Sequence, residues 1–445
     1  FGASESHDEL TMSSETDPSE LYESVSDTRK AEASIRKYIR TGATLSLSGS
    51  AVETESEPVI AGAEKLPAEN TGAIRFTLDI PLMKGAGTTA AMAGERTARM
   101  LAEAEKMNLI HTASQHVKNT TQSYWSFLSA SRNLEILKES EARARKTLSD
   151  NEQLIKGGEL MPAEKNQSLA NVADAIAARI DGEQSRFEAE QRLLLAMGAS
   201  GPELSADLAA ADDFPSLPDR SSLDAMNMEA LVKTALINRR DYRAVQVNCK
   251  AQHILMAAAR RNSLPKVDLQ LRASRNGYEK GDAFFDAFSK NVPGTSYFAG
   301  FVIEWPMGNN SAQGELLEAE ANFRKAIWTA ELMARTVRSD VKVARMRLAN
   351  SLEILRQVNE AGNQYKNSYE NEKKKYRLNM ASLLDVLRVE NQLTRADTRK
   401  VSALSRVASD LAHLRFVTGT LLDTRNELME VGLKNLTRLP LSEGD

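Results

Sequence analysis

The chain of 445 residues contains one cysteine, Cys249, and five scattered histidines. A single cysteine excludes an internal disulfide, and no spacing of Cys and His residues indicates a metal site. No run of about 18 apolar residues occurs, so the sequence predicts no membrane-spanning helix. The formal charge of −4 is too close to zero for a protein that binds nucleic acid through a basic face.

Catalytic signatures are also absent from the sequence. Gly85 and Gly87 follow a predicted strand, as in a phosphate-binding loop, but Ala90 occupies the position of the third glycine of such a loop. We therefore predict that the chain is not an enzyme and that it requires no cofactor.

Proline is rare, and two long stretches of the sequence contain none. They lie between Pro81 and Pro162 and between Pro306 and Pro440. In the second stretch, apolar and small residues recur at alternating spacings of three and four, which is typical of a coiled-coil seam. The residues of this seam are Ile327, Ala330, Ala334, Val337, Val341, Ala344, Leu348, Ser351, Leu355 and Val358. The pattern predicts long helical rods.

Each predicted rod is interrupted once by a short turn. The first turn is Lys156-Gly-Gly-Glu-Leu-Met-Pro162, and the second is Arg377-Leu-Asn-Met-Ala-Ser382. Gly and Asn tolerate the left-handed conformation that ends helices, and proline suits the first turn of the next helix. A return helix then runs to about Met197 in the first half and to about Thr418 in the second. The sequence therefore predicts two long helical hairpins.

Segments with period two precede both rods. Residues 74–80 and 297–305 alternate between apolar and polar, and each has a similar partner upstream, at 44–48 and 267–272. This alternation is typical of strands with one apolar face. On that face we expect Ile74, Phe76, Leu78, Leu269, Leu271, Phe301, Ile303 and Trp305. The segments at about 53–72 and 275–296 are expected to be surface loops.

The order of hairpin, proline, rod, turn and return helix occurs twice, which indicates an internal repeat. We expect a first structural repeat at 41–198, a linker at 199–227, a second repeat at 228–422 and a C-terminal tail at 423–445. Residues 1–40 are acidic and rich in serine, and we expect them to be disordered or inserted.

Four motifs resemble those of the TolC family of outer-membrane efflux proteins. They are Asn238-Arg-Arg-Asp-Tyr242, Leu264-Pro265, Ile80-Pro-Leu-Met-Lys-Gly85 and Tyr376-Arg-Leu-Asn-Met-Ala-Ser-Leu-Leu-Asp-Val-Leu387. The resemblance covers about residues 40–422. It implies a mainly α fold with a small β part, in which coiled-coil-like hairpins form a periplasmic α-barrel. Four strands per subunit would contribute to a trimeric, twelve-stranded outer-membrane β-barrel, because open strand edges are not tolerated in lipid.

The resemblance implies a passive exit duct from the periplasm to the exterior, in a tripartite efflux or type I secretion system. The implied partners are two further copies of the chain, a periplasmic adaptor, an inner-membrane pump and outer-membrane lipid. The implied location is the outer membrane of a Gram-negative bacterium, extending into the periplasm. The alternative is a coiled-coil scaffold or a periplasmic adaptor. An adaptor would carry a single helical hairpin, so the doubled hairpin favours the duct.

The resemblance also implies roles for the two turns, which meet the adaptor in this family. The residues concerned are Gly157, Gly158, Leu160, Asn379, Met380, Ala381 and Ser382. In the segment that follows the second turn, acidic side chains of the family constrict the periplasmic mouth of the tunnel. Asp385 matches the first acidic position, whereas Arg388 stands at the second. We expect these two residues, neighbours on a helix, to form the periplasmic gate.

Overall fold

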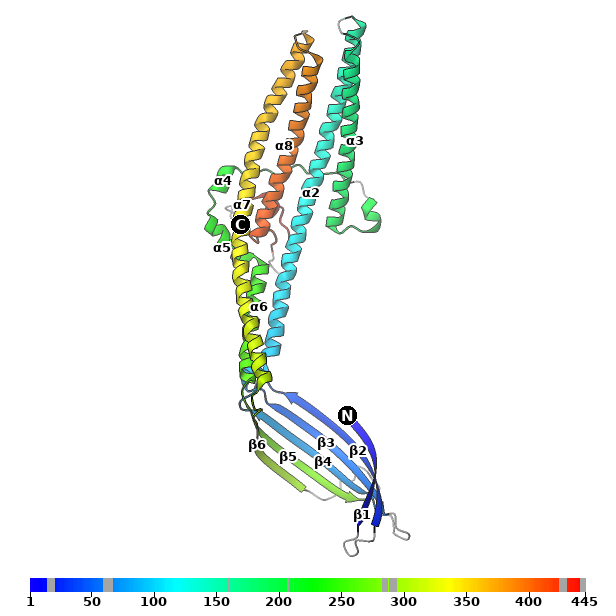
Figure 1. Cartoon of the computed structure of the whole chain (residues 1–445), viewed down its shortest axis with the longest axis vertical. Helices are drawn as coiled ribbons and strands as arrows, with labels where there is room; N and C mark the ends of the chain where they lie inside the picture. Colours follow the sequence, from blue (N-terminus) through cyan, green and yellow to red (C-terminus); the bar gives the residue numbers. More distant parts are fainter. Residues whose placement is uncertain are drawn as a thin grey trace. The chain divides into compact units, whose positions relative to one another are not determined.

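The computed structural model describes all residues except 14–20, 59–66, 159–160, 206–207, 211, 282–286, 288–293, 379, 424–429 and 441–445. The described residues form two units, each built from both halves of the sequence. The first unit consists of Phe1–Ala102 and Val247–Trp328, and the second consists of Glu103–Gln246 and Thr329–Asp445. The first unit contains the sheet, and the second contains the turns of both helical hairpins (Figure 1).

The sheet is antiparallel, and its six strands follow one another in sequence order (Figure 1). The strands are β1 (Gly2–Ser13), β2 (Leu21–Tyr38), β3 (Thr44–Pro58), β4 (Glu69–Pro81), β5 (Lys266–Lys280) and β6 (Gly294–Glu304). Strands β3 to β6 contain the four segments that the sequence predicted. The described sheet therefore has two strands more than the expected four.

The two additional strands correct the expectation for residues 1–40. Strands β1 and β2 form a hairpin there, so the expectation of disorder is wrong for the described part of this segment. Arg29 of β2 lies between two carboxylates, at 3.1 Å from Glu5 of β1 and 3.4 Å from Glu53 of β3. Strands held by such cross-strand pairs show no alternation of apolar and polar residues, which explains why the sequence pattern missed them.

The strands are also longer than predicted. Strands β3, β4, β5 and β6 extend into the segments 53–72 and 275–296, which we expected to be loops. In these extensions most side chains are polar or small on both faces, so the period-two signal ends before the strand does.

The register of β3 to β6 gathers apolar side chains on one face of the sheet. Three rows of cross-strand neighbours, which we call the apolar band, consist of Ile80–Leu269–Phe301, Leu45–Leu78–Leu271–Ala299 and Leu47–Phe76–Ala273–Tyr297. Ile74 and Ile303 continue the same face, and Trp305 directly follows β6. Phe301 and Ile303 are 66% and 68% exposed. On the opposite face, the Gln270 amide donates to Asp79 at 2.8 Å. The register thus gathers the strand residues that we expected on the apolar face on one side of the sheet.

Both helical hairpins turn and end where the sequence predicted. The first is α2 (Ala93–Lys156) with α3 (Glu164–Met197), and the second is α7 (Asn310–Arg377) with α8 (Leu383–Val417). The shorter helices are α1 (Gly87–Ala91), η1 (Gly201–Ser205), α4 (Arg220–Asp224), α5 (Met228–Asn238), α6 (Arg240–Asn262) and α9 (Leu433–Thr437). In the described ranges, none of the helices has the length and apolar character needed to span a bilayer.

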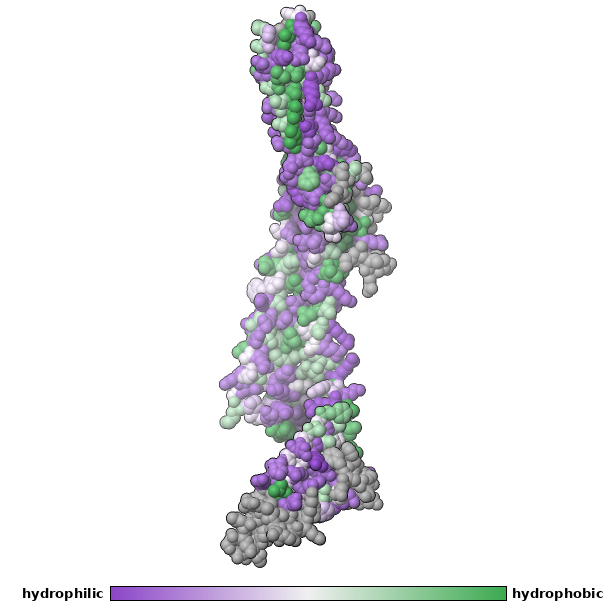
Figure 2. Space-filling view, turned by 90° about the vertical axis from the view of Figure 1, so that its right-hand side faces the viewer, coloured by the Kyte–Doolittle hydropathy of each residue, from purple (hydrophilic) through white to green (hydrophobic). Residues whose placement is uncertain are grey.

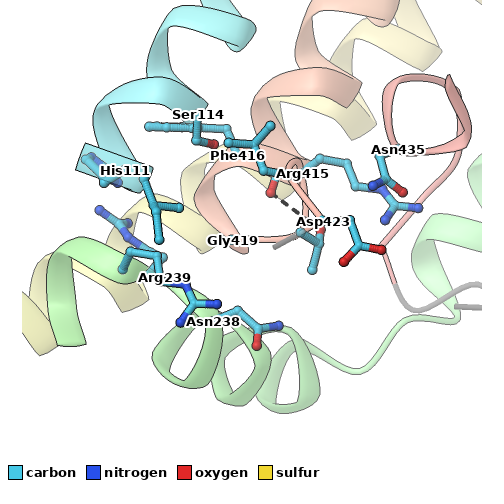
Figure 3. Close-up of a pocket in the computed structure, with 13 residues that line it drawn as sticks. His111, Ser114, Asn238, Arg239, Arg415, Phe416, Gly419, Asp423 and Asn435 are labelled. Carbon is cyan, nitrogen blue, oxygen red and sulfur yellow. Dashed lines mark hydrogen bonds between the residues drawn. The ribbon is translucent and has the colours of Figure 1, made fainter. Parts of the chain in front are cut away.

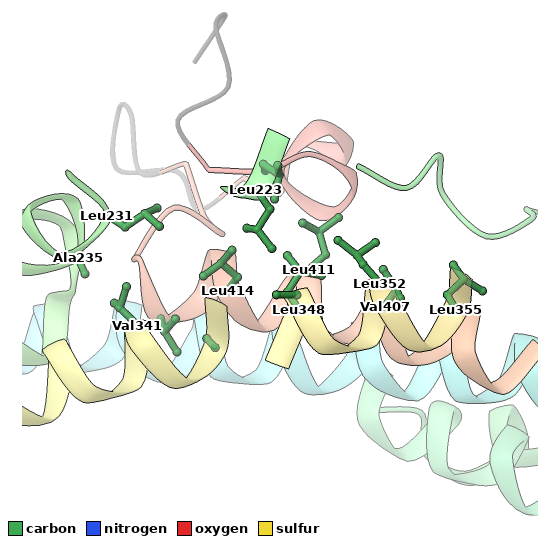
Figure 4. Packing of buried hydrophobic residues seen from close by; sticks show 14 of the residues in the cluster. Leu223, Leu231, Ala235, Val341, Leu348, Leu352, Leu355, Val407, Leu411 and Leu414 are labelled. Carbon is green, nitrogen blue, oxygen red and sulfur yellow. The ribbon is translucent and has the colours of Figure 1, made fainter. Parts of the chain in front are cut away.

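The main hydrophobic core lies where α7 meets α8, with α4 and α5 packed against them (Figure 4). Val337, Val341 and Leu348 of the predicted seam are fully buried there. They pack with Leu411 of α8 and with Leu223, which belongs to the segment that we expected to be a linker. The seam is confirmed in the second unit, and part of the expected linker covers the core.

Candidate functional site

The candidate site is formed by the turns of the two hairpins, which lie at the same end of the second unit (Figure 1). Gly158 has φ +77°, a left-handed conformation that glycine adopts without strain. Gly157 and Ser382 are exposed, and Ala381 is half-buried. Leu160 and Asn379, which we also predicted as tip residues, lie outside the described residues.

Large apolar side chains are exposed at both turns. Met161 and Met380 are each 74% exposed, and Leu378 and Leu384 are 69% and 64% exposed. Exposed apolar groups that cluster in this way mark interaction surfaces, and methionine adapts to partners of different shape. The composition of the turns therefore suits contact with another protein.

The predicted gate residues contact each other within one helix. A guanidinium nitrogen of Arg388 lies 3.4 Å from a carboxylate oxygen of Asp385, and the side chains are 68% and 41% exposed. Asp385 also completes a capping box. Its backbone N–H donates to the Ser382 hydroxyl oxygen at 3.3 Å, and its carboxylate accepts a hydrogen bond from the Ser382 backbone N–H at 3.3 Å. The hydrogen bonds from Ser382, assisted by the charge of Arg388, lower the pKa of Asp385. Asp385 is therefore part of the helix cap as well as a gate candidate.

A chain of polar contacts joins the two hairpins close to these turns. The Tyr376 hydroxyl of α7 donates to the Asn151 side-chain oxygen of α2 at 2.9 Å, and the Asn151 amide donates to Ser168 of α3 at 2.8 Å. Burial raises the pKa of Tyr376 to about 12, so its hydroxyl remains protonated and can donate. Three of the four long helices are thus connected through Asn151.

A second polar contact joins α2 to α8. The Arg143 guanidinium donates to Glu390 at 3.1 Å and to the Thr394 hydroxyl at 3.2 Å. Glu390 is only 3% exposed, and burial raises its pKa although Arg143 acts to lower it. The sequence analysis missed both contacts, because helical periodicity identifies the buried face of each helix but not the helix that it meets.

The Asn238–Tyr242 motif lies where α5 ends and α6 begins, and its first three residues line a pocket of about 330 Å³ (Figure 3). Arg239 is buried in an extended conformation between the helices. Its guanidinium donates to both carboxylate oxygens of Asp241, at 2.7 and 3.1 Å, and to Asp340 of α7 at 2.7 Å. Arg239 therefore links the residues between α5 and α6 to α7 of the second hairpin.

Other residues of this pocket also have structural roles. A Cβ atom on Gly419 would come within 2.8 Å of the Arg239 backbone nitrogen, so glycine is required at the end of α8. The imidazole of His111 lies 3.7 Å from Asp241, but burial lowers its pKa and favours the neutral form at pH 7. Over the described part of the chain, no group of three or more His, Cys, Asp or Glu side chains is placed to hold a metal ion.

Comparison with known proteins identifies the class of this fold. Residues 231–420 match the family described as "Outer membrane efflux protein". No curated protein sequence matches the chain. Among solved structures, the outer-membrane channel OprN matches with a TM-score of 0.67 and 15% identity, over 86% of this chain and 82% of that one. The outer membrane protein VceC from Vibrio cholerae matches with a TM-score of 0.64 and 15% identity, over 88% and 87%. The CmeC outer membrane channel of Campylobacter jejuni matches with a TM-score of 0.62 and 15% identity, over 89% and 78%.

These comparisons agree with the family that the motifs suggested. The family match covers most of the second repeat, and the fold of both repeats is similar to that of solved outer-membrane channels. The predicted mainly α fold with a small sheet is confirmed, and the match of residues 231–420 supports the predicted outer-membrane location and function as an efflux channel.

We predict that Arg239→Ala lowers the free energy of unfolding by about 3–5 kcal/mol, because it leaves the buried carboxylate of Asp241 without its partner. Arg338→Ala, which removes an exposed arginine of α7, should change it by less than about 0.5 kcal/mol. Urea denaturation followed by circular dichroism measures both values. Equal stability of the two variants would show that Arg239 does not fasten the helix break.

Proposed function

We propose that three copies of this chain form a passive exit duct through the outer membrane, as part of a tripartite efflux or type I secretion system. The observation that carries the proposal is the sheet, which has one exposed apolar face and two open edges. The apolar face suits lipid, but an open edge does not, because its peptide groups would lack hydrogen-bond partners. Pairing between copies of the chain satisfies both requirements.

The surface of the hairpins supports assembly with further copies. On α3, Ile180, Phe187 and Leu195 are between 52% and 64% exposed, and on α7, Leu332 and Met346 are 64% and 58% exposed. Figure 2 shows hydrophobic stripes on the hairpin surface, bordered by hydrophilic residues. Stripes of this kind are suited to helix packing in a trimer. A coiled-coil scaffold would use them equally, but it would not explain the apolar band of the sheet.

We assign the two turns to a periplasmic adaptor, which would connect the duct to an inner-membrane pump. The exposed apolar side chains Met161, Leu378 and Met380 support this assignment. Each chain supplies two turns, so a trimer presents several equivalent contacts whose affinities reinforce one another. We propose a channel and not an enzyme. In the pocket at the break between α5 and α6, Arg239 serves to hold helices together through Asp241 and Asp340.

The membrane role of the apolar face is tested by Phe301→Lys. A lysine that faces lipid costs about 2–4 kcal/mol at mid-depth, and a trimer would carry three copies. We expect the variant to be lost from the outer-membrane fraction, as measured by density-gradient fractionation and immunoblotting.

Val302→Lys is the matched control, because the adjacent residue faces the opposite side of β6 and pairs in register with Asp268. This variant should reach the outer membrane as the unaltered chain does. If Phe301→Lys inserts equally well, the apolar band does not face lipid.

For the adaptor contact, we predict that Gly157→Trp and Ala381→Trp abolish efflux while leaving the trimer intact. A bulky side chain at either turn prevents close approach of a partner backbone, and neither residue has a positive φ, so the substitutions add no backbone strain. Dye efflux from cells that also contain the adaptor and the pump measures the effect. Asn363→Trp, at an exposed position within α7, is the control. Unchanged efflux in the turn variants would exclude the turns as the docking site.

We also propose that Asp385 and Arg388 of the three copies surround the periplasmic mouth of the duct. Three carboxylates and three guanidiniums would nearly cancel in charge, so cations would be attracted less than by carboxylates alone. Each exposed pair contributes at most about 1 kcal/mol, and the closed state would depend on three pairs acting together.

Single-channel recordings in a planar bilayer test this arrangement. We expect Arg388→Ala to shift the reversal potential toward higher cation selectivity and Asp385→Asn to shift it in the opposite direction. Arg395→Ala removes another exposed arginine of α8 and should have no effect. If Arg388→Ala and Asp385→Asn both conduct as the unaltered channel does, the pair does not line the mouth.

A further inference from the structure

The described sheet ends in β6 on one side and in the hairpin of β1 and β2 on the other. Strand β1 pairs with β2 from Leu21 to Glu32. Residues 24–38 of β2 pair with β3, so β2 occupies the edge of β3 at the level of the apolar band.

The direction of these strands restricts how copies of the chain can join. All neighbouring strands are antiparallel, so β2, β4 and β6 run in the same direction. Contact between β6 of one copy and β2 of the next would therefore be parallel. Barrels of the bacterial outer membrane are built from antiparallel strands. Strand β3 runs opposite to β6 and would give an antiparallel contact, but β2 occupies its edge.

Strand β2 adds one apolar residue, Ile35, and one charged residue, Lys37, to the rows of the apolar band. On the face of the apolar band, Lys37 lies in register with Leu45, in the row that continues to Leu78 and Leu271. The three rows of the band contain no charged residue in β3 to β6. Farther along the same face of β2 are Asp27 and Arg29, of which Arg29 pairs with Glu53 of β3. A lysine in this row would carry its charge into the lipid.

Strand β1 is still more polar. Its register with β2 places Glu5, His7 and Glu9 on the face that carries the apolar band elsewhere. Glu5 contacts Arg29 at 3.1 Å and His7 contacts Asp27 at 2.6 Å, both on that face. Closure of the barrel through β1 would therefore bring a strongly charged strand to the joint between copies.

The turn between β2 and β3 is fixed at one end of the hairpin. The Thr41 carbonyl accepts a hydrogen bond from the Gly87 backbone N–H at 3.0 Å. Gly42 has φ +95°, and a Cβ atom on it would lie 2.5 Å from the Gly85 carbonyl oxygen. The turn is thus held against the segment between β4 and α2, and β2 could leave the edge of β3 while this turn stays in place.

We propose that β2, with β1 attached, is a cover strand that occupies the β3 edge of the single chain and is displaced when β6 of a second copy pairs with β3. An uncovered edge would pair with other chains indiscriminately, so a removable cover protects the protomer before assembly. The inference rests on the trimer of the proposed function, and it adds that assembly requires exchange of one strand for another.

Disulfides that lock the cover strand test the proposal, in a Cys249→Ser background that removes the native thiol. Ile35→Cys with Leu47→Cys joins β2 to β3, since the two residues are cross-strand partners. Phe76→Cys with Ala273→Cys joins β4 to β5 in the same row and leaves the β3 edge untouched. Purified monomer is oxidised or kept reduced, transferred to lipid vesicles, and assayed for trimer by native gel electrophoresis.

We expect the oxidised β2–β3 pair to give at least about tenfold less trimer than its reduced form, because the edge of β3 stays occupied. The oxidised β4–β5 pair should match its reduced form. Ser34→Cys with Ser48→Cys, cross-strand partners on the opposite face, provides a second lock if the first pair fails to fold.

Equal trimer formation by locked and unlocked chains would overturn the proposal, and it would indicate that β1 or β2 itself forms the joint between copies. If the proposed trimer itself does not exist, the result is different, because neither the reduced variants nor the unaltered chain then forms a trimer.

Discussion

The peptide groups at a strand edge in a lipid bilayer have no water to form hydrogen bonds with. The architecture of the sheet depends on this constraint. The described sheet ends in two such edges, and its apolar band is exposed on one face only. Pairing with other copies of the chain, as we propose, would satisfy both edges in a membrane. The single chain nevertheless has to be made before it assembles. The hairpin of β1 and β2 is well placed to cover one edge during that time.

The helical unit is held together in two different ways. Around Leu348 and Leu411, the second hairpin packs through fully buried apolar side chains, and Arg239 fastens the break between α5 and α6 to α7. Near the turns, the two hairpins are joined mainly by polar groups, through Asn151 and Arg143. An apolar core resists separation, whereas hydrogen bonds between side chains can be exchanged for bonds to water at modest cost. The hairpin ends are thus the part of this unit best suited to rearrangement.

The sequence predicted those parts of the fold that leave a periodic signal. Spacings of three and four identified the seam of α7, and alternation identified β3 to β6 over the apolar band. The hairpin of β1 and β2 was missed because its polar residues are held by cross-strand ion pairs, which create no periodicity. The strand extensions were missed because most of their side chains are polar or small on both faces.

The candidate site was less accessible to sequence reasoning. The turns were located by glycine and proline, and the contact between Asp385 and Arg388 followed from helical spacing. The capping box of Ser382 and Asp385 was overlooked, although Ser at the first position and an acidic residue three positions later is a recognisable signature. The contacts of Tyr376 with Asn151 and of Arg143 with Glu390 join residues far apart in sequence. No pattern within a single helix reports such contacts.

The central claim is that this chain works as a membrane-embedded trimer. Native mass spectrometry of the protein, released from detergent micelles after purification from membranes, measures the number of chains in each particle directly. The account predicts a single assembly of three 48.9 kDa chains that is extracted only with detergent. A monodisperse single chain that remains in solution without detergent would contradict it.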